Sequence, residues 1–435
     1  MKMDVPVSGL HQERRRVVVL LFVAFALRVL AAVLIDRHVE ASGRMFLIEG
    51  DANGYWELGR KMAAGENYEI HSPPRRILRT PGFPLLIAAS ICLFGESVFR
   101  ASLLLAAVGT VCCWLTYKLA RRIAGASAAI AALTLTAIAP LQIGSSVQVL
   151  SEGWFSVWLL LSVITLRPLI QSGTQEPRER SASRSALLQA VLSGCAAGCG
   201  VLVRPGWILW PAVAVVGIAF LGAGSWRRRT GLVVCLTLGC WFTLLPWAMR
   251  NYYVCGHWVH TSLWSGPSLY DGLNPQATGA SNMEFFDRDQ LMLKMDEYAM
   301  NEEYKRRAWK FVEQQPLQAF ELGLRKAARY LSPVLQADAV SSPAVTLSCL
   351  FWYLCVGFLV IRGSRQLWRA RQQPAVLLLW APFLQFLLIH LVFVGSVRYR
   401  LPVEFPLLVL AGAGLSGWRQ FFVQRTADHI AGRDA

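Results

Sequence analysis

Apolar stretches alternate with short polar stretches along nearly the whole chain. A helix of roughly 20 apolar residues crosses a hydrocarbon core of about 30 Å, and the longer stretches reach that length, so we expect about ten membrane-crossing helices. They are predicted at residues 17–35, 99–120, 123–141, 152–169, 186–203, 206–223, 230–249, 341–361, 375–394 and 401–417. The pattern therefore predicts an all-α polytopic membrane protein.

Shorter stretches predict helices outside the hydrocarbon core. Residues 53–64 have the spacing of an amphipathic helix, and the apolar stretch 82–95 is too short for a full crossing. We expect both to lie in the membrane interface, within a first outer loop at 36–98. Residues 287–316 have the periodicity of a further amphipathic helix on the outer face.

The basic residues orient these elements. The net charge of +16 could indicate nucleic-acid binding, but clusters of Lys and Arg stand between the apolar stretches, on alternate sides. The positive-inside rule places those clusters and both termini in the cytoplasm, with anionic lipid headgroups as their counter-charge. We expect a multi-pass protein of the inner (plasma) membrane with its other face in a periplasm-like space.

The order of the elements predicts three parts. The first is an N-terminal transmembrane module at 1–249, which includes the first outer loop. An outer loop region at 250–340 follows, and 341–435 forms a C-terminal transmembrane module with a cytoplasmic tail.

Several arginines contradict the charge rule, because they abut span ends on the predicted outer face. They are Arg79, Arg204, Arg250, Arg398 and Arg400. Each alone could be an anchor that reaches the headgroups, or the partner of a carboxylate. As a set they predict one phosphate site, since a guanidinium stays charged and can bind two oxygens at once.

Carboxylates are expected at the same membrane level. Asp51 follows the first span, with Glu49 two residues away, and Glu152 begins a later span from the same face. They could supply a general base, a metal site or an ion-pair network, and Asp51 could instead cap the helix at 53–64. His257 and His260 could form a metal pair, but their surroundings favour an extended segment. No cofactor is indicated with certainty, and a divalent metal ion stays open.

Segments spread over residues 15 to 415 resemble a known family. They are "GDANGYWELGRKMAAGENY", "RTPGFPLLIA", "FGESVFR", "LSEGWFSVWLLL", "GVLVRPGWILWPA", "PWAMRNYYVCGHWVHTS", "LYDGLNPQATG" and "RYRLPVEFPLLVLA". The sequence thereby resembles bacterial members of the GT-C glycosyltransferase superfamily related to the protein mannosyltransferases of family 39. Aminoarabinose transferases and Rgt-type galacturonosyl transferases are close relatives in that family.

The resemblance implies a GT-C-like bundle and a glycosyltransferase. Such an enzyme moves a sugar from a polyprenyl-phosphate donor to an acceptor hydroxyl of a glycan, lipid or protein on the outer face. It implies that Asp51 is the catalytic carboxylate and that Glu152 shapes the site. Basic residues would hold the carrier phosphate, a role carried over to Arg204, Arg250, Arg398 and Arg400.

Three further residues complete the candidate substrate-binding set: Tyr55, Arg79 and Asn251. The first outer loop lacks the adjacent Asp-Glu pair of the protein mannosyltransferases, and no additional large outer domain is evident, which disfavours a protein acceptor.

A transporter or flippase of a lipid phosphate or glycolipid is the main alternative. Transporters usually place ionisable residues near the bilayer midplane, in repeated halves. Here the polar positions gather at one face and no repeat is evident, which favours the enzyme. Neither a Walker A loop nor a GxGxxG fingerprint is present, in keeping with a donor that is not a nucleotide.

Overall fold

The computed structural model describes residues 7–170, 180–334 and 343–431. Within these ranges the chain is helical and contains no β-strand, as expected. Seven described helices are long and apolar enough to cross a membrane. They are α1 (Val7–Ala41), α4 (Val98–Ile138), α6 (Glu152–Ile170), α7 (Arg180–Val203), α9 (Trp226–Cys255), α15 (Pro343–Arg369) and α16 (Gln373–Val392).

The other expected spans are also helical. The stretch at 206–223 forms the 3₁₀ turn η1 (Pro205–Leu209) and α8 (Trp210–Leu221), and 401–417 lies in α17 (Val397–Ala431). The spans at 99–120 and 123–141 both belong to α4, which is interrupted at Gly125 with φ 83°. Glycine adopts this positive φ without strain from a side chain.

Arg28 of α1 lies against both halves of α4. Its guanidinium Nη2 donates to the carbonyl of Thr136 at 3.4 Å, and Gly109 approaches its Nε so closely that a Cβ there would lie 2.7 Å away. The Thr136 carbonyl is available because Pro140, four residues on, has no N–H to donate to it. The contact fixes α1 beside the folded-back α4.

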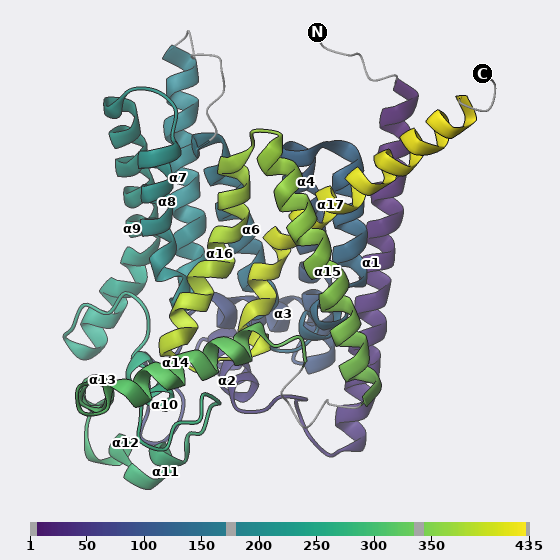
Figure 1. Ribbon diagram of the computed structural model, residues 1–435. Helices are drawn as coiled ribbons and strands as arrows, with labels where there is room; N and C mark the ends of the chain where they lie inside the picture. Colours follow the sequence, from purple (N-terminus) through teal and green to yellow (C-terminus); the bar gives the residue numbers. More distant parts are fainter. Residues whose placement is uncertain (1–6, 171–179, 335–342, 432–435) are drawn as a thin grey trace.

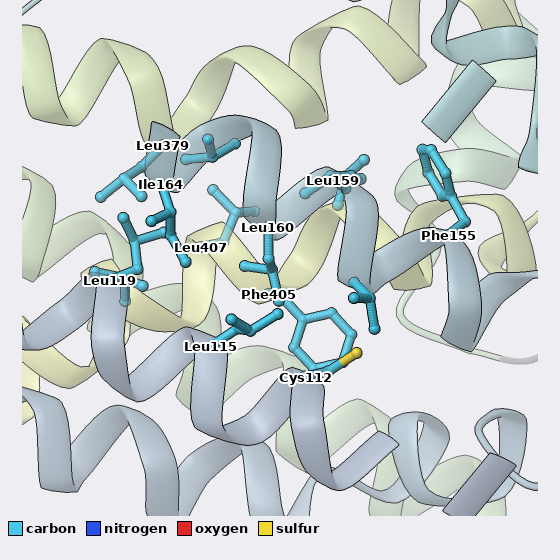
Figure 2. Packing of buried hydrophobic residues seen from close by; sticks show 14 of the residues in the cluster. Cys112, Leu115, Leu119, Phe155, Leu159, Leu160, Ile164, Leu379, Phe405 and Leu407 are labelled. Carbon is cyan, nitrogen blue, oxygen red and sulfur yellow. The ribbon is translucent and has the colours of Figure 1, made fainter. Parts of the chain in front are cut away.

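Apolar side chains of several helices form the core of the bundle. Figure 2 shows apolar side chains from α4, α6, α16 and α17 packed together, among them Cys112, Leu115, Leu119, Phe155, Leu159, Leu160, Ile164, Leu379, Phe405 and Leu407. Small residues allow the helices to approach closely. A Cβ at Gly363 of α15, for example, would lie 1.8 Å from the carbonyl oxygen of Leu410 in α17.

One end of the bundle carries shorter helices. They are α2 (Asp51–Ala63), α3 (Gly82–Phe94), α5 (Pro140–Ser145), α10 (Ser265–Gly272), α11 (Glu284–Asp289), α12 (Leu291–Lys294), α13 (Glu297–Gln314) and α14 (Pro316–Leu331). In Figure 1, α2 and α10 to α14 gather at this end, while α1 begins and α17 ends at the opposite end. The expected helices at 53–64 and 82–95 are present as α2 and α3.

The segment at 287–316 differs from the single helix expected there. Gln290 has φ 50°, a left-handed conformation that ends α11. Asp296 then starts α13 by accepting a hydrogen bond from the Ala299 N–H at 2.8 Å. The expected domain boundary at 249/250 falls within α9, and the one at 340/341 lies outside the described residues.

Candidate active site

Asp51 is the first residue of α2, and both of its carboxylate oxygens are paired with arginines. Arg79 Nη2, from the loop between α2 and α3, lies 2.5 Å from Oδ1. Arg398 Nη1, at the start of α17, lies 3.0 Å from Oδ2. The helix cap is Gly50, and Asp51 makes no capping hydrogen bond. Asp51 therefore does not cap α2, the alternative role that was considered for it.

Glu152 begins α6 and is buried, with 2% of its side chain exposed. Its Oε1 lies 2.5 Å from Arg398 Nε and 3.1 Å from Arg204 Nη1. Its Oε2 is buried and has no hydrogen-bond partner among the described residues. Because an unmet buried acceptor is unfavourable by about 1–3 kcal/mol, this oxygen is suited to a donor group brought by a ligand.

Arg398 joins the two carboxylates through different nitrogens. We call Asp51, Arg79, Glu152, Arg204 and Arg398 the Arg398 cluster. Its members come from α2, the loop after α2, the start of α6, the end of α7 and the start of α17. The cluster carries one more positive than negative charge, which favours a monoanionic ligand.

Aromatic rings border the cluster. Tyr55 is buried and stacks its ring 5.2 Å from the Arg79 guanidinium carbon. The ring of Tyr399 lies 5.3 Å from the guanidinium carbon of Arg204. The same ring stacks in parallel on the His390 ring, and the two ring centroids are 4.6 Å apart. Tyr399 and His390 were not identified from the sequence. The position of Tyr399 between Arg398 and Arg400 was the available signal.

Arg250 and Asn251 contact backbone carbonyls of nearby segments rather than the carboxylates of the Arg398 cluster. Arg250 donates to the carbonyls of Arg76 at 2.7 Å and Tyr68 at 3.2 Å. Tyr68 in turn donates its hydroxyl to the Arg79 carbonyl at 3.1 Å. Asn251 is buried and donates to the Val259 carbonyl at 2.8 Å. The structure thus places Arg250 where it holds the segment that carries Arg79.

Arg400 also points away from the cluster. Residues two apart on a helix project in widely different directions, and Arg400 pairs with Glu404 at 2.7 Å. It also donates to the carbonyls of Tyr330 and Ser332. Five arginines were predicted on the outer face. The structure brings Arg79, Arg204 and Arg398 together and leaves Arg250 and Arg400 outside the cluster.

The arginines set the charge state of Asp51. Burial alone raises the pKa of its carboxyl, but Arg79 and Arg398 outweigh that effect and hold this pKa well below its usual range. Asp51 is therefore ionised at neutral pH. Among the described residues, no three His, Cys, Asp or Glu side chains form a group that could hold a metal ion. His257 instead stacks on Tyr298 at 3.6 Å.

No family model and no curated protein matches the sequence. Solved structures nevertheless share the fold of this chain, which confirms the expected all-α polytopic architecture. The apo oligosaccharyltransferase of Archaeoglobus fulgidus matches with a TM-score of 0.58 and 14% identity over 95% of this chain and 52% of that one. The archaeal oligosaccharyltransferase AglB from Archaeoglobus fulgidus, in complex with an inhibitory peptide and a dolichol-phosphate, matches with a TM-score of 0.56. Its identity is 13% over 97% of this chain and 52% of that one.

A weaker likeness links the chain to ArnT from Cupriavidus metallidurans bound to undecaprenyl phosphate. Its TM-score is 0.40 and its identity 15%, over 95% of this chain and 78% of that one. The present chain spans about half the length of the archaeal enzyme. At these identities the likeness to AglB establishes the fold alone.

Proposed function

We propose that the protein is a membrane glycosyltransferase that moves a sugar from a polyprenyl-phosphate-linked donor to an acceptor hydroxyl of a glycan, lipid or protein. The observation that carries this proposal is the Arg398 cluster. Two carboxylates and three arginines, from distant parts of the sequence, meet at the end of the bundle that carries the short helices.

The arginines are suited to the donor's phosphate. Arginine forks match phosphate oxygens, and charge-assisted hydrogen bonds to them are about twice as strong as neutral ones. Arg79 Nε is buried and has no hydrogen-bond partner in the part of the chain that the structure describes, so this nitrogen can still donate to a ligand. AglB, which shares the fold, has been solved with a dolichol-phosphate. This supports a lipid phosphate as the ligand here.

The proposed reaction needs few groups. The acceptor oxygen attacks the anomeric carbon, and the bond from that carbon to the phosphate oxygen breaks with its electron pair going to the phosphate. The acceptor proton passes to Asp51, which acts as the general base. Arg79, Arg204 and Arg398 stabilise the charge that develops on the leaving phosphate. Tyr55 and Glu152 shape the site. Arg250, Asn251 and Arg400 bind backbone carbonyls and thereby hold the segments around it.

We place the site on the outer face of the inner membrane. The predicted cytoplasmic clusters include "QERRR" at 12–16 in α1, and α1 begins at the end of the bundle opposite to α2. The positive-inside rule then puts α2 outside. Both carboxylates of the cluster are paired with guanidiniums.

A transporter or flippase has no observation in its favour. The ionisable residues of the Arg398 cluster lie at one end of the bundle rather than midway along it. Arg28 lies deep within α1, but it donates to helix carbonyls of Ala24 and Thr136. It has the contacts of a residue that fixes helices.

The proposal is tested with the purified protein and a lipid extract of the cell envelope. Mass spectrometry should detect a free polyprenyl phosphate and a newly glycosylated acceptor with the native protein, and neither with Asp51→Asn. Glycan and glycolipid profiles of cells with and without the protein would then identify the sugar. Identical profiles and no released polyprenyl phosphate would contradict the proposal.

A further inference from the structure

Each carboxylate oxygen of Asp51 is paired with an arginine in the structure. Arg79 contacts one oxygen at 2.5 Å and Arg398 contacts the other at 3.0 Å. These guanidiniums come from different segments and approach from different sides of the carboxylate. The same two arginines are the proposed ligands of the donor phosphate. The base and the phosphate site therefore share their cations.

This pairing conflicts with the task of a general base. A general base needs a pKa near the working pH. The charged and titratable groups around Asp51 are Arg79, Arg398, Arg204, Glu152 and Tyr399, and the arginines dominate. A carboxylate held this way binds a proton poorly. Withdrawal of an arginine would make Asp51 a stronger base toward the acceptor.

Resting on the proposed function, we propose that Arg79 and Arg398 hold Asp51 in an inactive pairing, and that the donor's phosphate activates Asp51 by taking its place on these guanidiniums. The donor thus prepares its own base. Proton acceptance by Asp51 then depends on a bound donor, so the donor must bind before the acceptor is activated.

The geometry allows this exchange without a large movement. Arg398 uses Nε for Glu152 and Nη1 for Asp51. Its Nη1 can therefore pass from Asp51 to a phosphate oxygen while Nε keeps its contact with Glu152. A phosphodiester offers two non-bridging oxygens, the same number that the Asp51 carboxylate offers to the two arginines. Glu152 thereby positions Arg398 throughout the exchange.

The expected consequence is a change in the reactivity of Asp51. Carbodiimides modify protonated carboxyl groups, so modification reports how readily a carboxylate takes up a proton. We suggest labelling the full-length protein in detergent at pH 6.5, with and without saturating farnesyl phosphate, and locating the adducts by mass spectrometry. Labelling of Asp51 should rise about tenfold for each unit by which its pKa increases.

Glu404 is the matched internal control. It is held by Arg400 at 2.7 Å and lies outside the cluster, so farnesyl phosphate should leave its labelling unchanged. In Arg398→Gln, Asp51 should label strongly without any ligand, whereas Arg400→Gln should affect Glu404 only. Arg398→Lys provides a second variant if the first fails to fold, because one ammonium group cannot keep both contacts of the guanidinium.

The outcomes separate this inference from the proposed function. One outcome is that farnesyl phosphate binds but Asp51 labelling neither rises with it nor responds to either Arg398 variant. The inference would then be wrong, while a lipid phosphate would remain the proposed class of donor. If farnesyl phosphate does not bind at all, both are wrong. A rise at Glu404 equal to that at Asp51 would indicate general loosening and would also overturn the inference.

Discussion

Arg398 and Glu152 are 246 residues apart in the sequence, yet Nε of the arginine lies 2.5 Å from Oε1 of the glutamate. The pair joins the start of α17 to the start of α6. Because the same arginine also contacts Asp51, it links the proposed base, the phosphate site and two helices of the bundle. Substitutions at this point should have effects that substitutions at exposed ion pairs lack.

Arg398→Gln should reduce transfer by about a hundredfold to a thousandfold, the effect of removing one donor that stabilises developing charge. Arg398→Lys should lie between this variant and the native protein, since lysine keeps the charge but loses the fork. Turnover with a lipid-linked donor gives the measurement. Arg325→Gln is the control, because Arg325 pairs with Glu321 on an exposed part of α14. Equal effects at both positions would remove Arg398 from the site.

Asp51→Asn should lower turnover by about a hundredfold to ten-thousandfold, the range of a lost general base. Membrane insertion and chromatographic behaviour in detergent should remain those of the native protein. Glu49→Gln, two residues away and exposed, should retain full activity. Near-native turnover of Asp51→Asn would assign the proton transfer to another group.

Arg250→Ala should weaken donor binding by about tenfold, a loss of about 1.4 kcal/mol. The reason is indirect: Arg250 holds the segment from Tyr68 to Arg76, and Tyr68 contacts the backbone of Arg79. Apparent donor affinity should fall while the turnover at saturating donor changes little. If Arg250 contacted the phosphate itself, turnover should fall together with affinity, as for Arg398.

Lys326 gives a prediction for pH. This residue of α14 is buried and donates to the Val392 carbonyl at 2.7 Å, and burial lowers its pKa to about 8, although Asp271 partly opposes the shift. Between pH 8 and the ordinary lysine pKa of 10.5, the unfolded chain binds more protons at this residue than the folded chain does. Stability therefore rises with pH in this window, by up to about 3 kcal/mol.

Thermal unfolding in detergent between pH 7 and 10 would detect this effect. The melting temperature of the native protein, relative to that of Lys326→Met, should increase from pH 8 upwards. Parallel curves for the two proteins would show that Lys326 keeps its proton in the folded state.

The orientation of the bundle can be tested by labelling single cysteines with a membrane-impermeant reagent in intact cells. Glu66→Cys after α2 and Glu313→Cys in α13 are exposed and should react from outside. Arg227→Cys at the start of α9 should react only after the membrane is opened. The reverse pattern would place the Arg398 cluster in the cytoplasm.

Much of the fold follows from local properties of the sequence. Apolar length predicts the spans, and helical periodicity predicts α2. Three of the arginines that contradict the charge rule are brought together by the structure, on the carboxylates Asp51 and Glu152. Asp51, Glu152, Arg79, Arg204 and Arg398 could be nominated in this way, because burying charge near a membrane is unfavourable unless it is paired.

What each charged side chain contacts was decided only by tertiary packing. Arg398 and Arg400 have the same sequence context, yet one faces Glu152 and the other Glu404, because they project from different faces of α17. Likewise, the pairing of Arg250 with backbone carbonyls depends on where a distant loop folds. Apolar length and periodicity are properties of one segment, whereas an ion pair depends on how several segments pack together.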